Sequence, residues 1–127
     1  MQVVRIYNDE NGDSHFGDME LVGQAQLSST GAWTEVSEPF AVDSVVLRDV
    51  ISEAPEGAPH VSPARIIIVP LVGTVEVEAS DGETRRFGPG ELVLLEDTAG
   101  KGHITRNIGS HRRSTLVVAL RASEKAT

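Results

Sequence analysis

The sequence contains no cysteine among its 127 residues. This absence excludes disulfide bonds, thiolate nucleophiles and cysteine-ligated zinc or iron–sulfur sites. Only three Phe, one Trp and one Tyr are present, so aliphatic side chains must fill most of a core. No apolar run approaches the roughly 20 residues of a membrane-spanning helix, and residues 1–10 contain no basic segment followed by a long apolar run, so we expect no signal peptide. We therefore expect a cytoplasmic protein that does not enter a membrane.

Basic residues are also few. The chain has 11 Lys and Arg against 19 Asp and Glu, which gives a formal net charge of −8. Such a chain repels phosphate backbones, and its two basic clusters, at residues 85–86 and 111–113, have no interleaved aromatic residues. We expect no nucleic-acid partner, and the length indicates a single domain over residues 1–127.

Short β-branched runs make up much of the sequence. Val, Ile and Thr together supply 31 of the 127 residues, in runs separated by Gly, Pro, Asp and Asn. This composition is typical of strands, and no segment has the apolar period and capping signals of a long helix. The predicted strands are Val3–Tyr7, Met19–Val22, Ala32–Val36, Ser44–Arg48, Ala64–Leu71, Thr74–Ala79, Thr84–Phe87, Glu91–Leu95, Lys101–Asn107 and Ser114–Leu120. We predict an all-β sandwich or barrel.

Residue alternation assigns faces to two of these strands. In the segment 74–78, Val alternates with Glu, which predicts one buried and one exposed face. The segment 65–71 is apolar on both faces, which predicts a central strand covered on both sides, with Pro70 at an edge or bulge. Between segments 74–79 and 84–87, Asp81 and Gly82 predict a hairpin turn.

Two of the four histidines lie in suggestive settings. His60 ends the proline-rich loop 52–62, and Ser62 lies on the same face of an extended chain. His103 begins a strand in which Thr105 and Asn107 share its face. If both imidazoles reach the interior, they could form an acid–base pair or part of a metal site. The alternative for His60 is a loop position at the surface.

A longer pattern surrounds His103. Gly90, Gly100, His103 and Asn107 occur in this order, with Thr98 two residues before Gly100. The order resembles the second motif of the cupin superfamily: Gly, a short run, Pro-x-Gly, two residues, His, three residues, Asn. Thr98 replaces the proline. The resemblance is to small single-domain bacterial cupins and covers about residues 37–120.

The first cupin motif is matched less completely. It has the form His-x-His, three or four residues, Glu, six residues, Gly, and here His60 and Gly73 stand at its two ends. Ser62 stands where the family has its second His, and Ile66 where it has its Glu. Since metal-binding cupins commonly use three His and one Glu, this chain keeps only His60 and His103 of that set.

The resemblance implies a jelly roll, a double-stranded β-helix barrel with its ligand cavity inside, usually as a homodimer. In that fold Ile66 and Ile68 would project into the barrel, in agreement with their alternation. The core would cover residues 37–120, followed by a flexible tail at 122–127. The N-terminal strands or the region around Trp33 would join the two subunits.

We expect no tightly bound cofactor, because neither Ser62 nor Ile66 replaces a strong metal ligand. A divalent metal held by His60 and His103 is the alternative. It would need a further donor, for which the candidates are His15, Glu96 and Asp97. For Glu96 and Asp97 themselves we expect a solvated turn, with a paired general acid as the alternative.

Arg65 and Trp33 each have two interpretations. Arg65 could orient an anionic or carbonyl group of a substrate, or it could form an ion pair with one of the many acids. Trp33, the single tryptophan, could stack on a ligand at the barrel mouth, or pack in the core or at a dimer interface.

Together these observations predict an isomerase, lyase or cyclase that acts on a small molecule in an apolar barrel. His103 and His60 would be its general acid and base, because apolar surroundings favour a neutral imidazole. The predicted substrate contacts are Arg65, Ser62, Ile66, Ile68, Thr105, Asn107 and Trp33. One alternative is a non-catalytic small-ligand-binding cupin, in which both histidines would face solvent or bond to backbone. A divalent-metal-dependent cupin enzyme is the other alternative.

Overall fold

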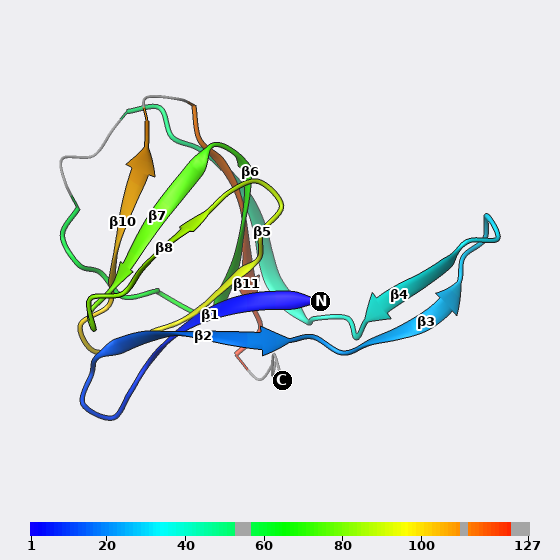
Figure 1. Ribbon diagram of the computed structural model, residues 1–127, viewed down its shortest axis with the longest axis horizontal. Coiled ribbons are helices and arrows are strands. Elements are labelled where there is room, and N and C mark those ends of the chain that lie inside the picture. The colour runs from blue at the N-terminus through cyan, green and yellow to red at the C-terminus, as the bar shows by residue number, and fades with distance from the viewer. Residues whose placement is uncertain (53–56, 110–111, 123–127) are drawn as a thin grey trace.

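The computed structural model describes residues 1–52, 57–109 and 112–122. Within them the chain forms eleven strands and no helix, and hence no helix that could span a membrane (Figure 1). The predicted loop at 52–62 and tail at 122–127 lie partly outside this part of the chain. The strands are β1 (Gln2–Asn8), β2 (Ser14–Glu20), β3 (Gly23–Leu27), β4 (Trp33–Ser37), β5 (Val42–Asp49), β6 (Ile66–Val72), β7 (Thr74–Ala79), β8 (Thr84–Phe87), β9 (Val93–Glu96), β10 (His103–Ile108) and β11 (Ser114–Leu120).

The strands form two larger sheets and a separate hairpin (Figure 1). The six-stranded sheet has the order β2-β1-β9-β6-β11-β5, and the three-stranded sheet has the order β10-β7-β8. In the described residues β1 and β9 pair in parallel, and the other strand pairs are antiparallel. This all-β arrangement is consistent with the predicted jelly roll. No described strand of one sheet pairs with a strand of the other, so the predicted barrel is open.

Aliphatic side chains fill the space between the two sheets. Ile6, Ile66 and Val117 of the six-stranded sheet belong to the same buried cluster as Val75 and Val77 of the three-stranded sheet. The strand β7 alternates between buried and half-buried residues, as its Val and Glu pattern predicts. The side of each sheet that carries this cluster is called the inner face below.

The six-stranded sheet is apolar on its outer face as well. Val3, Ile67, Leu94 and Leu120 form a second buried cluster. Strand β6 therefore contributes Ile66 to one cluster and Ile67 to the other, and it lies between β9 and β11. The prediction of a central strand covered on both faces is confirmed.

A bulge accommodates the proline of β6. Along β11 the register with β6 shifts between Ser114, which pairs with Val72, and Thr115, which pairs with Pro70. A proline cannot donate a ladder hydrogen bond, so an irregular position suits it. The predicted bulge is confirmed.

All ten predicted strands overlap observed ones, and the predicted bounds of β7, β8 and β11 match residue for residue. Two parts of the prediction are wrong. Strand β3 was not predicted, because Gly23–Leu27 contains no β-branched residue. Strand β2 begins at Ser14 instead of Met19, because polar residues and Gly17 obscure its first half.

A glycine allows the loop before β6 to approach the start of β10. Gly102 has a positive φ of 73°, and a Cβ at this position would lie 2.1 Å from the carbonyl oxygen of His60. Any larger residue would therefore separate the two segments. The carbonyl of Gly102 also accepts a hydrogen bond of 2.7 Å from the buried hydroxyl of Ser14.

We predict that Gly102→Ala lowers the free energy of unfolding by about 3 kcal/mol, because left-handed strain and overpacking add. Gly82→Ala is the matched control. Gly82 also has a positive φ, of 97°, but a Cβ there would meet no atom within 4 Å. Its expected loss is about 1 kcal/mol. Urea unfolding of both variants measures the difference, and equal losses would contradict the close approach at Gly102.

Candidate functional site

His103 lies on the inner face at the start of β10. Its antiparallel partner in β7 is Ala79, which belongs to the cluster between the sheets. The alternation of β10 gives Thr105 and Asn107 the same face as His103, opposite the buried Val77 and Val75 of β7. Thr105 and Asn107 are half-buried, so solvent reaches this part of the inner face, whereas His103 is only 3% exposed.

Asp97 is bonded to His103 in the interior. Its Oδ2 lies 2.5 Å from Nδ1 of His103, and the aspartate is 0% exposed. This contact favours the imidazole tautomer with the proton on Nδ1, which leaves the lone pair on Nε2. In the described part of the chain, Oδ1 of Asp97 is buried with no hydrogen-bond partner. The pair therefore resembles the carboxylate-oriented imidazole of acid–base enzymes.

His60 packs against His103 from the loop before β6. The two residues form an antiparallel bridge, with N–O distances of 3.0 Å and 2.9 Å between their backbones. Their ring centroids are 4.6 Å apart, at an interplanar angle of 57°. His60 is exposed, and its Nδ1 lies 3.4 Å from the carbonyl oxygen of Ala58. The structure thus brings together one buried and one solvent-facing imidazole.

Ser62 and Ile66, the positions compared above with metal ligands of the first cupin motif, have structural roles. The hydroxyl of the buried Ser62 donates a 2.6 Å hydrogen bond to the carbonyl of Ala64, and its backbone N–H donates to the carbonyl of Asp97. Ile66 is part of the cluster between the sheets, and the half-buried Ile68 packs against it. Ser62 and Ile66 therefore shape the interior near His103.

The donors around His103 do not form a metal site of three His and one Glu. Nδ1 of His103 is bonded to Asp97, and Ser62 and Ile66 supply no strong ligand. Among the described residues, no group of three or more His, Asp or Glu side chains is placed to hold an ion. We therefore assign no chemical step to a metal.

Arg65 is placed differently from the substrate clamp considered for it. Its Nε donates to Oε2 of Glu96 at 3.0 Å, and Nε of Arg5 donates to Oε1 of the same carboxylate at 2.9 Å. The ion-pair interpretation of Arg65 is the one that the structure supports. The adjacent acids Glu96 and Asp97 also have different surroundings. Glu96 bonds to the two arginines, whereas Asp97 is buried beside His103. The expected solvated turn is wrong.

Trp33 lies far from the histidines, on the β3–β4 hairpin that projects from the sheets (Figure 1). Its side chain is 73% exposed, so packing in the core of its own chain is wrong. Ligand stacking beside His103 in the same chain is equally inconsistent with this position.

Asp97 was considered from the sequence only as an additional metal donor or a paired general acid, and its bond to His103 was not predicted. Its position at the end of a strand, beside another acid, suggested solvent exposure. The alternation of β9 contains the missing signal, because Val93 and Leu95 are in the cluster between the sheets. Two residues beyond Leu95, Asp97 is expected on the same inner face.

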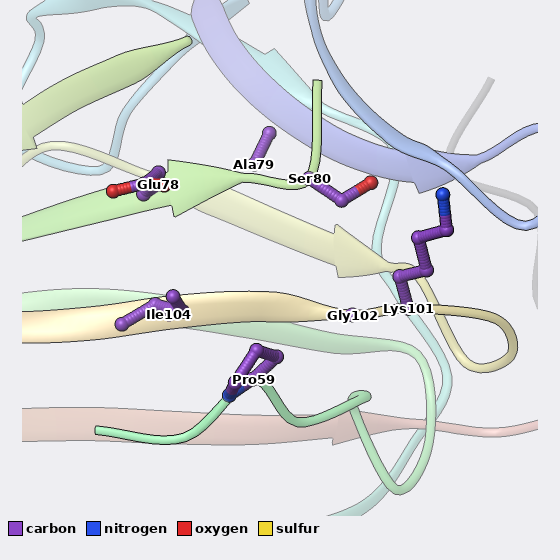
Figure 2. Close-up of a pocket in the computed structure, with 7 residues that line it drawn as sticks. All are labelled: Pro59, Glu78, Ala79, Ser80, Lys101, Gly102 and Ile104. Carbon is purple, nitrogen blue, oxygen red and sulfur yellow. The ribbon is translucent and has the colours of Figure 1, made fainter. Parts of the chain in front are cut away.

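The pocket shown in Figure 2 lies on the other side of the β7–β10 pair. It has a volume of about 440 Å³, and Glu78 and Ile104, which flank Ala79 and His103 in the register, contribute to its wall. Alternation therefore points Glu78 and Ile104 away from the pair formed by Asp97 and His103. The other lining residues are Pro59, Ala79, Ser80, Lys101 and Gly102.

A second group of titratable residues, formed by His15 with Asp9 and Asp81, lies near the turn between β1 and β2. Nε2 of His15 is 2.7 Å from Asp9, and Nδ1 is 2.8 Å from Asp81. The hydrogen bonds with Asp9 and then Asp81 raise the pKa of His15 above its usual value. Protonated His15 therefore connects the β1–β2 turn to the β7–β8 turn.

This cluster predicts a pH dependence of folding stability. Because the pKa of His15 is higher in the folded chain, its stabilisation is complete below the unfolded value near 6.5 and is lost as the pH rises through the folded pKa. Urea unfolding across this range should show the loss in the unaltered chain and not in His15→Gln. Asp81→Asn, which removes one of the two acids, should show a smaller loss. An unchanged pH dependence in His15→Gln would contradict the assignment.

No protein-family model matches this chain, and no curated protein was found that is similar to it in sequence.

Proposed function

We propose that this chain is a cupin-type enzyme that isomerises, cleaves or cyclises a small organic molecule by acid–base catalysis, without a tightly bound metal. The observation that carries the proposal is the buried contact between Asp97 and His103, with His60 beside it. A catalytic base needs a fixed tautomer and an accessible lone pair. Asp97 supports the first requirement, because its contact with Nδ1 leaves the lone pair of His103 on Nε2.

The roles of the two histidines follow from their exposure. His103 is oriented and shielded from water, so we assign it the proton abstraction from the substrate. His60 faces solvent, so it can return a proton to the substrate and exchange it with water. Thr105, Asn107 and Ile68 lie on the same inner face and would contact the substrate. A cytoplasmic location is part of this proposal, since the chain has no cysteine that would need an oxidising compartment.

The test is proton exchange catalysed by the full chain in deuterium oxide. Isomerases, lyases and cyclases of this type remove a proton from carbon. When a panel of small carbonyl and hydroxy acids is screened, the compound that is a substrate should therefore incorporate deuterium. We expect His103→Ala to lower this rate at least ~100-fold while unfolding stays cooperative. Asp97→Asn should lower it by a similar factor, because the amide can turn its N–H₂ toward Nδ1 and select the wrong tautomer.

Thr34→Ser is the control, since Thr34 lies on the projecting hairpin and has no role in this proposal. NMR detects the exchanged protons directly, without a coupled assay. Turnover that persists unchanged in His103→Ala would overturn the proposed mechanism.

The second candidate is a non-catalytic ligand-binding module. It is favoured by the contact of His60 with the backbone carbonyl of Ala58 and by the exposure of its ring. In that case the same panel would shift the NMR signals of His60 and His103 without any deuterium incorporation.

The third candidate, a divalent-metal enzyme, is separated from these by metal content. We predict far less than one metal ion per chain, because two histidines with one Nδ1 already engaged form a weak site. Elemental mass spectrometry on chain purified without chelator measures this, with His60→Ala and His103→Ala as comparisons. Near-stoichiometric metal that is lost in both variants would restore the metal-dependent function.

A further inference from the structure

Three arginines lie where β5 ends and β11 begins. Arg48 of β5 pairs with Thr115 at the start of β11. The carbonyl of Arg113 accepts a 3.0 Å hydrogen bond from the backbone N–H of Val50, just beyond β5, and Arg112 precedes Arg113 in the sequence. These contacts bring two basic residues of a cluster noted in the sequence next to a third. We call Arg48, Arg112 and Arg113 the arginine cluster.

The arginine cluster is positive in a chain that is negative as a whole. Asp49 is the one acid of the segments 48–50 and 112–114, and its carboxylate accepts hydrogen bonds from the hydroxyl of Ser114 and, at 3.4 Å, from Arg112. The bond from Ser114, and then the charge of Arg112, lower the pKa of Asp49 below its usual value. Three positive charges thus face one negative charge here, whereas the net charge of the chain is −8.

Arg48 belongs to the inner face of the six-stranded sheet. Val46, two residues before it, pairs with Val117, which is part of the cluster between the sheets. By alternation Arg48 shares this face. Strand β5 is the edge strand of the sheet, and Val46 is 49% exposed, so the inner face is open to solvent at this edge. A molecule that enters here from solvent meets the exposed Arg48.

An apolar strip of β6 leads from the arginine cluster toward the candidate site. Pro70 lies in the same row of the sheet as Arg48. Ile68 and then Ile66 follow on the inner face. Ile66 pairs with the end of β9, beyond which Asp97 lies on the same face. The rows of Pro70 and Ile66 are four residues apart, which is about 13 Å at ~3.3 Å per residue. A molecule that contacts both ends of this strip must be elongated.

We propose that the substrate is an elongated organic acid whose carboxylate binds the arginine cluster, with Arg48 as its main contact. This inference rests on the proposed function, because it places the reacting carbon at His103, at the other end of the strip. The apolar body of the substrate lies over Ile68, and the planar guanidinium matches a carboxylate in shape and charge. The rest of the chain is acidic and repels anions, so this local positive charge determines where the carboxylate binds.

Three probe molecules separate the two parts of this interaction in the full chain. Octanoate has a carboxylate and an apolar tail, acetate has only the carboxylate, and 1-octanol has only the tail. We expect an NMR titration with octanoate to shift the signals of both Arg48 and Thr105. Octanoate should bind at least ~10-fold more tightly than acetate or 1-octanol, because only octanoate makes both contacts. Added salt should weaken the binding of octanoate and not that of 1-octanol.

Substitutions of single arginines test which of them holds the carboxylate. Arg48→Gln should weaken octanoate binding about 10-fold and leave 1-octanol binding unchanged. Arg112→Gln should have a smaller effect, because Arg112 is already paired with Asp49. Arg86→Gln is the matched control. It changes the net charge equally, but Arg86 precedes the buried Phe87 of the cluster between the sheets and so faces outward. It should leave octanoate binding unchanged.

Three outcomes would overturn the proposal: octanoate that does not shift the Arg48 signals, octanoate and 1-octanol that bind equally well, or octanoate binding that is unaffected by Arg48→Gln. The proposed enzymatic function fails separately. If octanoate binds as expected but no compound of the panel exchanges deuterium, the arginine cluster holds the ligand of a non-catalytic module. If an uncharged compound exchanges fastest, and equally fast in Arg48→Gln, the enzymatic function stands and the carboxylate site is rejected.

Discussion

The backbone contacts of residues 60–62 are the constraint on which the candidate site depends. Through His60 this short segment forms a bridge with His103 at the start of the three-stranded sheet, and through Ser62 it bonds to Asp97 at the end of β9 in the six-stranded sheet. It thereby connects the two sheets at the point where their buried polar groups meet. Gly102 permits the close approach of this segment to β10. The Asp97–His103 pair, the tautomer of His103 and the exposed imidazole of His60 beside it all depend on that approach.

Local pattern was sufficient for most strands but not for their arrangement. The alternation in β7 and the doubly apolar sequence of β6 identified a half-buried and a central strand, because burial imposes these patterns directly on the residues. Strand β3 lacks such a pattern, since most of its residues are exposed and burial imposes no alternation on them. The pairing of β1 with β9 joins residues far apart in the sequence, and no local pattern records which distant strand is the neighbour.

The same distinction applies to the site. The spacing around His60 and His103 predicted residues that the structure brings into contact, because motif positions are tied to the ends of particular strands. The burial of Asp97 beside His103 was not predicted, because an acid at a strand end usually faces water and only the continued alternation of β9 indicates otherwise. The role of Arg65 depended on which of many acids lies beside it, and that is a property of the strand order.

The position of β1 in the sheet also determines how the chain can fold. β1 and β2 are adjacent in sequence and form a local hairpin, but the other neighbour of β1 is β9, whose residues follow about 90 positions later. During synthesis the residues of β1 and β2 therefore emerge long before those of β9, while Ile6 and Phe16 still lack their cover. Such non-local pairing slows folding, and it leaves these apolar residues uncovered until most of the chain has emerged.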